Sequence, residues 1–160
     1  MQNLLPAAAA LGAHLKARGE TISVAESSVG GLLSAALLAV PGASAYFMGG
    51  AVVYTRASRR VLLDISDAQM DGVRPSSEPY ALMMARAVRV RLGTVWGLAE
   101  TGAAGLAGNR YGDAAGHACI AVAGPVELSI TVETGHGDRV ANMRGFAAEA
   151  LALLGRALSA

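Results

Sequence analysis

The stretch TISVAESSVGG, residues 21–31, decides how the fold is read. Its first part, TISVAE, is a short β-branched run that predicts a strand over residues 21–26. GGLLSAALLAV follows and predicts a helix that is stopped by Pro41 and Gly42. A strand, a glycine turn and a helix in this order are typical of α/β proteins, so we expect the same alternation along the rest of the chain.

Helices and strands do alternate in the predictions for the remaining sequence. Further helices are predicted over residues 3–20, 56–65 and 78–93 and from Asp138 onward. Further strands are predicted over residues 49–55, 94–100, 117–124 and 126–134, the last two as a hairpin. Residues 101–116 are rich in glycine and predict a long loop. The predicted fold is a single α/β domain over residues 1–160, a three-layer sandwich whose mixed, mostly parallel sheet carries helices on both faces.

Composition narrows the class of protein. The 160 residues carry a net charge of +1, and only 4% are aromatic, so neither the basic stripe nor the stacking rings of a nucleic-acid-binding protein are present. Hydrophobic residues make up 53% and charged residues only 16%. A surface so poor in charge predicts that part of it is covered by another subunit, and we expect a homo-oligomer.

The expected location is the cytoplasm. Cys119 is the only cysteine, so an intrachain disulfide is impossible, as is usual in a reducing compartment. The first twenty residues do not resemble a signal peptide, and no apolar run reaches the roughly 18 residues of a membrane helix. No cluster of residues has the spacing of metal ligands, so we expect neither a metal nor a cofactor.

Two glycine-rich loops follow predicted strands, SSVGG after the first and TGAAGLAGNRYG after the strand over residues 94–100. If these strands are parallel, both loops lie at the edge of the sheet where α/β proteins bind ligands. Backbone N–H groups at such a turn stabilise a phosphate or an oxyanion. Neither loop has a recognised phosphate-binding signature, so an anion site and an ordinary turn both remain open.

Four motifs then occur in a fixed order: AESSVGG at 25–31, GGAVVY at 49–54, TGAAGLAG at 101–108 and GDR at 137–139. They resemble AESCTGG, GG-x-V-x-Y, TG-x-AGP-x-GG and GDR of the CinA C-terminal domain, the family of the competence/damage-inducible protein CinA that includes nicotinamide-nucleotide amidohydrolases. The chain departs from these motifs at Ser28, Val29 and Leu106, where the family has Cys, Thr and Pro.

The resemblance implies a ligand, a reaction and a set of site residues. The ligand would be a pyridine nucleotide, and the reaction would convert nicotinamide mononucleotide and water to nicotinate mononucleotide and ammonia. Ser27 would be the nucleophile, with Arg59 and Tyr54 as the other catalytic positions. The implied substrate-binding residues are Glu26, Ser28, Gly30, Gly31, Gly50, Thr101, Gly102, Ala104 and Gly105.

Arg59 stands where the family has a lysine, the base expected for the serine. A guanidinium cannot accept a proton at neutral pH. Arg59 is either a phosphate anchor or part of a solvated helix face. Lys16, the only lysine, lies on the first helix and is not expected at the site, whereas His117 is an alternative base or a strand-edge histidine.

Two further residues have structural as well as functional interpretations. Glu26 could act as a base, cap the following helix or pair with Arg59, and Tyr54 could contact substrate or pack within its strand. With the lysine replaced, the alternative to the enzyme is a catalytically inactive nucleotide- or phosphate-binding homologue, or an assembly protein with the same fold.

Overall fold

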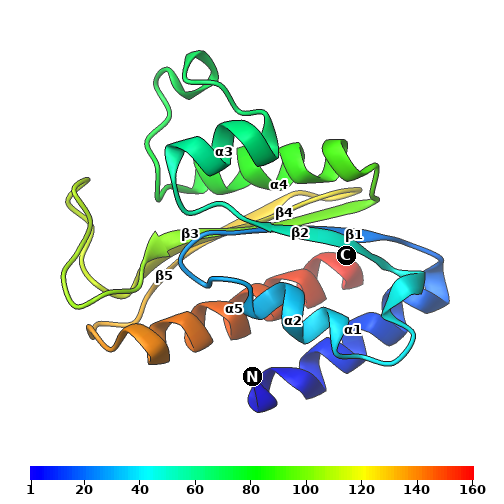
Figure 1. Cartoon of the computed structure of the whole chain (residues 1–160). Coiled ribbons are helices and arrows are strands. Elements are labelled where there is room, and N and C mark those ends of the chain that lie inside the picture. Colours follow the sequence, from blue (N-terminus) through cyan, green and yellow to red (C-terminus); the bar gives the residue numbers. More distant parts are fainter.

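Five strands form one sheet in the order β2-β1-β3-β4-β5, shown in the computed structural model, which describes residues 1–160 (Figure 1). The strands are β1 (Ile22–Glu26), β2 (Phe47–Val52), β3 (Trp96–Ala103), β4 (His117–Ala123) and β5 (Leu128–Glu133). β1 lies between β2 and β3 and is parallel to both, whereas β4 is antiparallel to β3 and β5. The predicted mixed sheet is confirmed, but its pairings divide evenly between parallel and antiparallel instead of being mostly parallel. β3 returns to β4 without a crossover helix, and such a connection makes an antiparallel pair.

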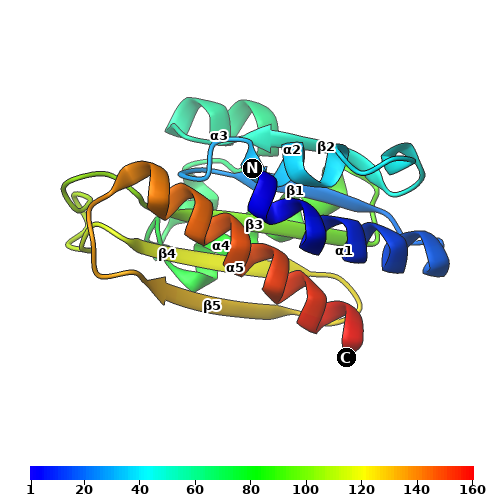
Figure 2. The same ribbon diagram turned by 90° about the horizontal axis from the view of Figure 1, so that it is seen from below.

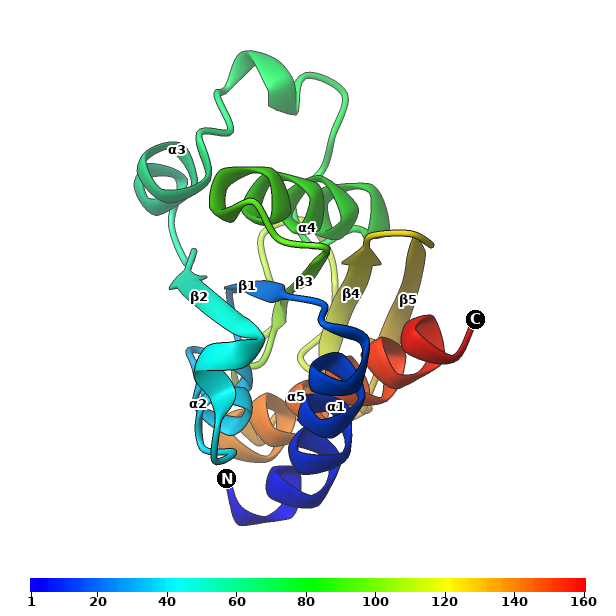
Figure 3. The ribbon, with the colours of Figure 1, turned by 90° about the vertical axis from the view of Figure 1, so that its right-hand side faces the viewer.

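Helices cover both faces of the sheet, which confirms the three-layer prediction (Figures 1 and 3). The α-helices are α1 (Leu5–Arg18), α2 (Leu32–Leu38), α3 (Arg56–Leu63), α4 (Glu78–Leu92) and α5 (Arg139–Ser159). The short 3-10 helices are η1 (Gln2–Leu4), η2 (Ala43–Ala45) and η3 (Ala68–Met70). α3 and α4 lie on one face, and α1, α2 and α5 lie on the other. Seen from that second face, α5 crosses β3, β4 and β5, while α2 lies against β1 and β2 (Figure 2).

The two faces carry separate hydrophobic cores. The larger core joins α1, α2 and α5 to the sheet and includes the fully buried Trp96 and Phe146. The smaller core lies beneath α4 and includes Met84. None of the helices is both long and apolar enough to cross a membrane.

The predicted helix limits are set by local chemistry. α1 ends at Gly19 and α4 at Gly93, both in the left-handed conformation that glycine adopts without strain. The Asp138 carboxylate accepts a hydrogen bond of 3.0 Å from the Ala141 N–H and caps α5, as expected from the sequence.

The bounds of all five strands differ from their predictions by up to three residues, and β2 and β3 are shifted along the chain. β2 covers Phe47–Val52 instead of residues 49–55, because the chain leaves the sheet after the Val53 N–H has bonded to the Glu26 carbonyl. β3 continues to Ala103, three residues past its predicted end. The extension is stabilised by pairing of Thr101 to Ala103 with β4, so the predicted long loop begins only at residue 104.

Candidate functional site

Three parallel strands bring their following segments to one edge of the sheet. Ser27 comes directly after β1, Tyr54 follows β2, and Thr101 lies near the end of β3. Because β1 is hydrogen-bonded to both neighbours, these carboxyl ends lie side by side. The sheet edge predicted from the two glycine-rich loops is therefore present.

A cleft of about 530 Å³ opens at this edge. Five of the predicted site residues line it, namely Ser27, Tyr54, Arg59, Thr101 and Gly102. The other walls come from the beginning of α3, the segment before α4 and the loop after β3. Ser27 is partly exposed, and its hydroxyl makes no hydrogen bond within the chain, so it is free to contact a ligand.

The charges on the cleft walls are all positive. Arg56, Arg59 and Arg110 line the cleft, and no aspartate, glutamate, lysine or histidine does. Two of the aromatic lining residues, Tyr54 and Tyr111, are exposed. The Arg110 guanidinium lies 5.2 Å from the centre of the Tyr111 ring, within the range of a cation–π contact.

Arg59 is held firmly in this wall. Only 4% of Arg59 is exposed, so the prediction of a solvated helix face is wrong for this residue. Its Nε donates to the Ile65 carbonyl at 3.2 Å, and its Nη2 bonds and pairs with the Asp67 carboxylate. Burial alone would raise the pKa of Asp67, but Arg56 and Arg59 together hold it below its ordinary value. Nη1 of Arg59 has no partner in the chain and remains available to a ligand.

Tyr54 connects the cleft to the GDR motif. Its hydroxyl accepts a hydrogen bond of 3.1 Å from Nη2 of Arg139, which was matched by sequence but not placed among the site residues. Gly105 lies outside the cleft, but a side chain there would come within 2.6 Å of Nη1 of Arg139. The glycine therefore leaves room for this guanidinium.

Glu26 does not reach the cleft, so its predicted place among the substrate-binding residues is corrected. It is fully buried, and its carboxylate accepts hydrogen bonds from the N–H groups of Gly31, Leu33 and Ser34 at 2.8–3.0 Å. The Ser34 hydroxyl adds a fourth bond at 2.5 Å. Of the three roles left open for Glu26, helix capping is confirmed, because its carboxylate accepts from N–H groups at the beginning of α2.

The other glycines and Ala104 are also structural. Gly30 and Gly31 have φ of 67° and 101°, and the Gly31 N–H is already bound to Glu26. A side chain at Gly50 would come within 2.2 Å of the Ser34 hydroxyl. Gly30, Gly31, Gly50 and Ala104 do not line the cleft, so the structure does not place them at the predicted substrate site.

Glu100, near the end of β3, is the residue that the sequence interpretation missed. It is fully buried, and its Oε2 accepts from the N–H groups of Ser27 at 3.1 Å and Val29 at 2.9 Å. Its Oε1 accepts from the Ser28 hydroxyl, so Ser28 also faces away from the cleft. Burial, reinforced by the charge of Glu26, raises the pKa of Glu100 to about 7 against the opposing effect of these hydrogen bonds. An acid inside an otherwise apolar strand, GLAE, was the available signal.

His117 is not placed to act as a base for Ser27. Its Nε2 bonds to the Ser76 carbonyl at 2.9 Å, and its Nδ1 bonds to the Glu133 carboxylate. Burial lowers the pKa of His117, but these two acceptors outweigh burial and raise it overall. Both ring nitrogens are therefore already bonded, and His117 itself does not line the cleft.

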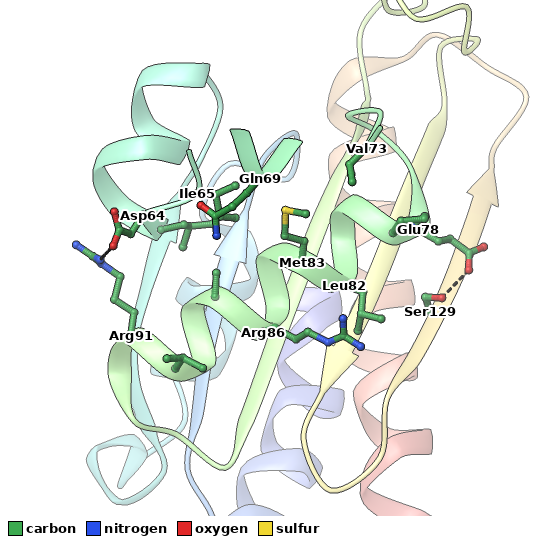
Figure 4. Close-up of a pocket in the computed structure, with 14 residues that line it drawn as sticks. Asp64, Ile65, Gln69, Val73, Glu78, Leu82, Met83, Arg86, Arg91 and Ser129 are labelled. Carbon is green, nitrogen blue, oxygen red and sulfur yellow. Dashed lines mark hydrogen bonds and ion pairs between the residues drawn. The ribbon is translucent and has the colours of Figure 1, made fainter. Parts of the chain in front are cut away.

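A larger hollow of about 880 Å³ lies elsewhere, on the outer face of α4 (Figure 4). Leu82 and Met83 line it, with the Arg91–Asp64 ion pair at one end and the Glu78–Ser129 hydrogen bond at the other. None of the predicted site residues lines this hollow. The smaller cleft is the candidate site because it combines the free serine hydroxyl with a net positive charge, since three arginines line it and only Asp67 pairs with two of them.

Known proteins resemble this chain in sequence and in fold. The sequence model of the CinA C-terminal domain matches residues 5–158. A CinA-like protein from Parasynechococcus marenigrum (strain WH8102) is 42% identical over 127 residues, which cover 79% of this chain and 30% of that protein. The chain thus spans less than a third of the length of the first curated relatives.

Solved structures match over almost the full chain. The competence-damaged protein (CinA) superfamily protein from Enterobacter cloacae has a TM-score of 0.89 and 27% identity, covering 97% of this chain and 92% of that one. The competence/damage inducible protein CihA from Agrobacterium tumefaciens has a TM-score of 0.89 and 26% identity, covering 98% and 96%.

Proposed function

The chain belongs to the CinA C-terminal domain family, and from that premise we propose that its cleft binds a phosphorylated pyridine nucleotide such as nicotinamide mononucleotide. The observation that carries the proposal is the charge of the cleft walls, on which every charged side chain is an arginine. A phosphate group brings the opposite charge and suits the planar fork of a guanidinium.

The positions of the arginines support a phosphate as the ligand group. Arg59 is fixed by Asp67 and the Ile65 carbonyl, so its free Nη1 is presented without loss of side-chain entropy on binding. Arg56, which also lies on α3 and pairs with Asp67 at 3.1 Å, and Arg110, on the loop after β3, are exposed and can close on the ligand. The cleft therefore has one rigid and two adjustable phosphate donors.

The aromatic residues suit the rest of a nucleotide. Tyr54 and Tyr111 line the cleft, and a cationic pyridinium ring is attracted to the face of a tyrosine. Thr101 and Gly102 supply the floor at the end of β3. A side chain at Gly102 would come within 2.4 Å of the His117 carbonyl, so the glycine is required by strand pairing.

Arg110→Ala is expected to weaken the binding of nicotinamide mononucleotide about tenfold, since one charge-assisted hydrogen bond to phosphate contributes about 1.5 kcal/mol or more. Arg110 is exposed and forms no ion pair, so the fold is not expected to change. Isothermal titration calorimetry measures the affinity. The matched control is Arg144→Ala, an exposed arginine on α5 outside the cleft. Equal affinities for the two variants would contradict the assignment of Arg110.

Amide hydrolysis is the second candidate function, and the free hydroxyl of Ser27 on the cleft wall favours it. Ser27 Oγ would attack the carboxamide carbon, the C–N bond would break with loss of ammonia, and water would then release nicotinate mononucleotide. The step needs a proton acceptor for the hydroxyl, and no carboxylate, histidine or lysine lines the cleft. Binding without hydrolysis is therefore the first proposal.

Ammonia release separates the two candidates. We expect the wild-type protein and Ser27→Ala to bind nicotinamide mononucleotide and to release ammonia at the same background rate. A coupled ammonia assay on both proteins at equal ligand saturation makes the comparison. If the wild type exceeds Ser27→Ala by about a hundredfold or more, the hydrolase replaces the binding protein as the proposed function.

A further inference from the structure

Glu100 binds three consecutive residues of the turn that carries Ser27. Its two carboxylate oxygens accept from the Ser27 N–H, the Ser28 hydroxyl and the Val29 N–H. The Ser27 N–H lies 3.1 Å from the main-chain carbonyl of Glu100 as well. A single residue on β3 thus holds residues 27–29, the first part of the turn that follows β1.

The carboxylate that makes these bonds is neither solvated nor paired with a cation. Glu100 is fully buried, and no arginine, lysine or histidine contacts it. Ile120 lies opposite on β4, and Glu26 on β1 is the charged neighbour. A buried acid costs stability unless its bonds are retained, and all of its bonds go to the turn.

From this geometry we propose that Glu100 is a positioning residue, whose ionised carboxylate fixes the turn over residues 27–29 and so directs Ser27 into the cleft. Its effect on ligand binding rests on the proposed function, whereas its hold on the turn does not. Ser28 takes part as the side-chain donor to the same carboxylate.

The ionisation of Glu100 decides how tightly the turn is held. Burial raises the pKa of this carboxyl to about 7, so it is ionised above that pH and protonated below it. When protonated, the acid donates its own proton to the Ser28 oxygen, and its bonds to the two N–H groups become weaker neutral ones. The turn is therefore held most tightly above neutral pH.

The hold on the turn can be measured without a ligand. In ¹⁵N-labelled protein titrated between about pH 5 and 9, the amide resonances of Ser27 and Val29 are expected to move together with a midpoint near 7. Glu100→Gln keeps the shape and one acceptor, and it should abolish this movement while the rest of the spectrum is retained. The amides of Gly31, Leu33 and Ser34, which bind Glu26, are the internal control and should not follow the same curve.

Ligand affinity is the second measurement that tests the positioning role of Glu100. At pH 8, Glu100→Gln is expected to bind nicotinamide mononucleotide about three- to tenfold more weakly than the wild type, because neutral bonds replace charge-assisted ones. At pH 6 the two affinities should converge. The phosphate of the ligand titrates near pH 6 as well, but the ratio of the two proteins cancels this effect.

The amide titration and the ligand affinities together distinguish a failure of the proposed function from a failure of the positioning role of Glu100. Wild-type protein that binds no nucleotide, while its Ser27 and Val29 amides titrate as expected, would refute the proposed function and leave the hold of Glu100 on the turn established. Amides of Ser27 and Val29 that do not titrate, or that titrate unchanged in Glu100→Gln, would overturn the positioning role. A constant affinity ratio across the pH range would also overturn it.

Discussion

Replacing Glu26 by alanine is expected to lower the free energy of unfolding by about 4 kcal/mol, the largest stability loss that we predict for a single side chain outside the apolar core. The Glu26 carboxylate accepts three N–H groups and one hydroxyl at the beginning of α2. Each buried N–H left without an acceptor costs about 1–3 kcal/mol of stability. Water that enters the site and bonds to these N–H groups recovers part of that loss. The loss is large because no other side chain caps this helix.

Urea unfolding followed by circular dichroism measures this effect. Glu26→Gln keeps one amide oxygen in place and should lose only about half as much. The matched control is Glu149→Ala, an exposed acid on α5, with an expected change within about 0.5 kcal/mol. A loss for Glu26→Ala as small as that of Glu149→Ala would refute the role of Glu26 as the N-terminal cap of α2.

The sequence predicted the architecture because helix ends and strand patterns are local properties. Asp138 and Gly93 mark the helix ends where they were expected. The direction of β4 was harder to foresee, because it depends on whether the loop after β3 crosses the sheet. That loop carries no helix, and the chain therefore returns antiparallel.

For the turn after β1, the sequence left an anion site and an ordinary turn both open, and the carboxylates that the turn binds could not be predicted. Its N–H groups bind Glu26 and Glu100 of the chain itself. A sequence shows which donors a turn offers, but it does not show which acceptor reaches them. Glu100 lies 73 positions after Ser27 in the sequence, and its carboxylate reaches the turn because β1 pairs with β3.

Arg59 is a second residue whose surroundings could not be predicted from the sequence. Its helix has exposed arginines at 56 and 60, and the spacing alone cannot tell that the middle one is buried. Burial follows from Asp67 and the Ile65 carbonyl, which lie beyond the end of α3. The position remains on the cleft wall, as expected, but as a fixed cation.

Loss of the phosphate is expected to have the largest effect on ligand binding. Nicotinamide riboside keeps the ring and the sugar of nicotinamide mononucleotide but cannot engage Arg59, Arg56 or Arg110 through a phosphate. Two charge-assisted hydrogen bonds to phosphate contribute about 3 kcal/mol, which corresponds to about a hundredfold in affinity. The weakening should diminish at high salt, because two of the three arginines are exposed.

Calorimetric titration of the wild-type protein with these two ligands tests whether the cleft is a phosphate-anchored nucleotide site. We expect nicotinamide mononucleotide to bind about a hundredfold more tightly than nicotinamide riboside at the same pH and salt concentration. Equal affinities for the two, or no heat from the mononucleotide, would contradict it.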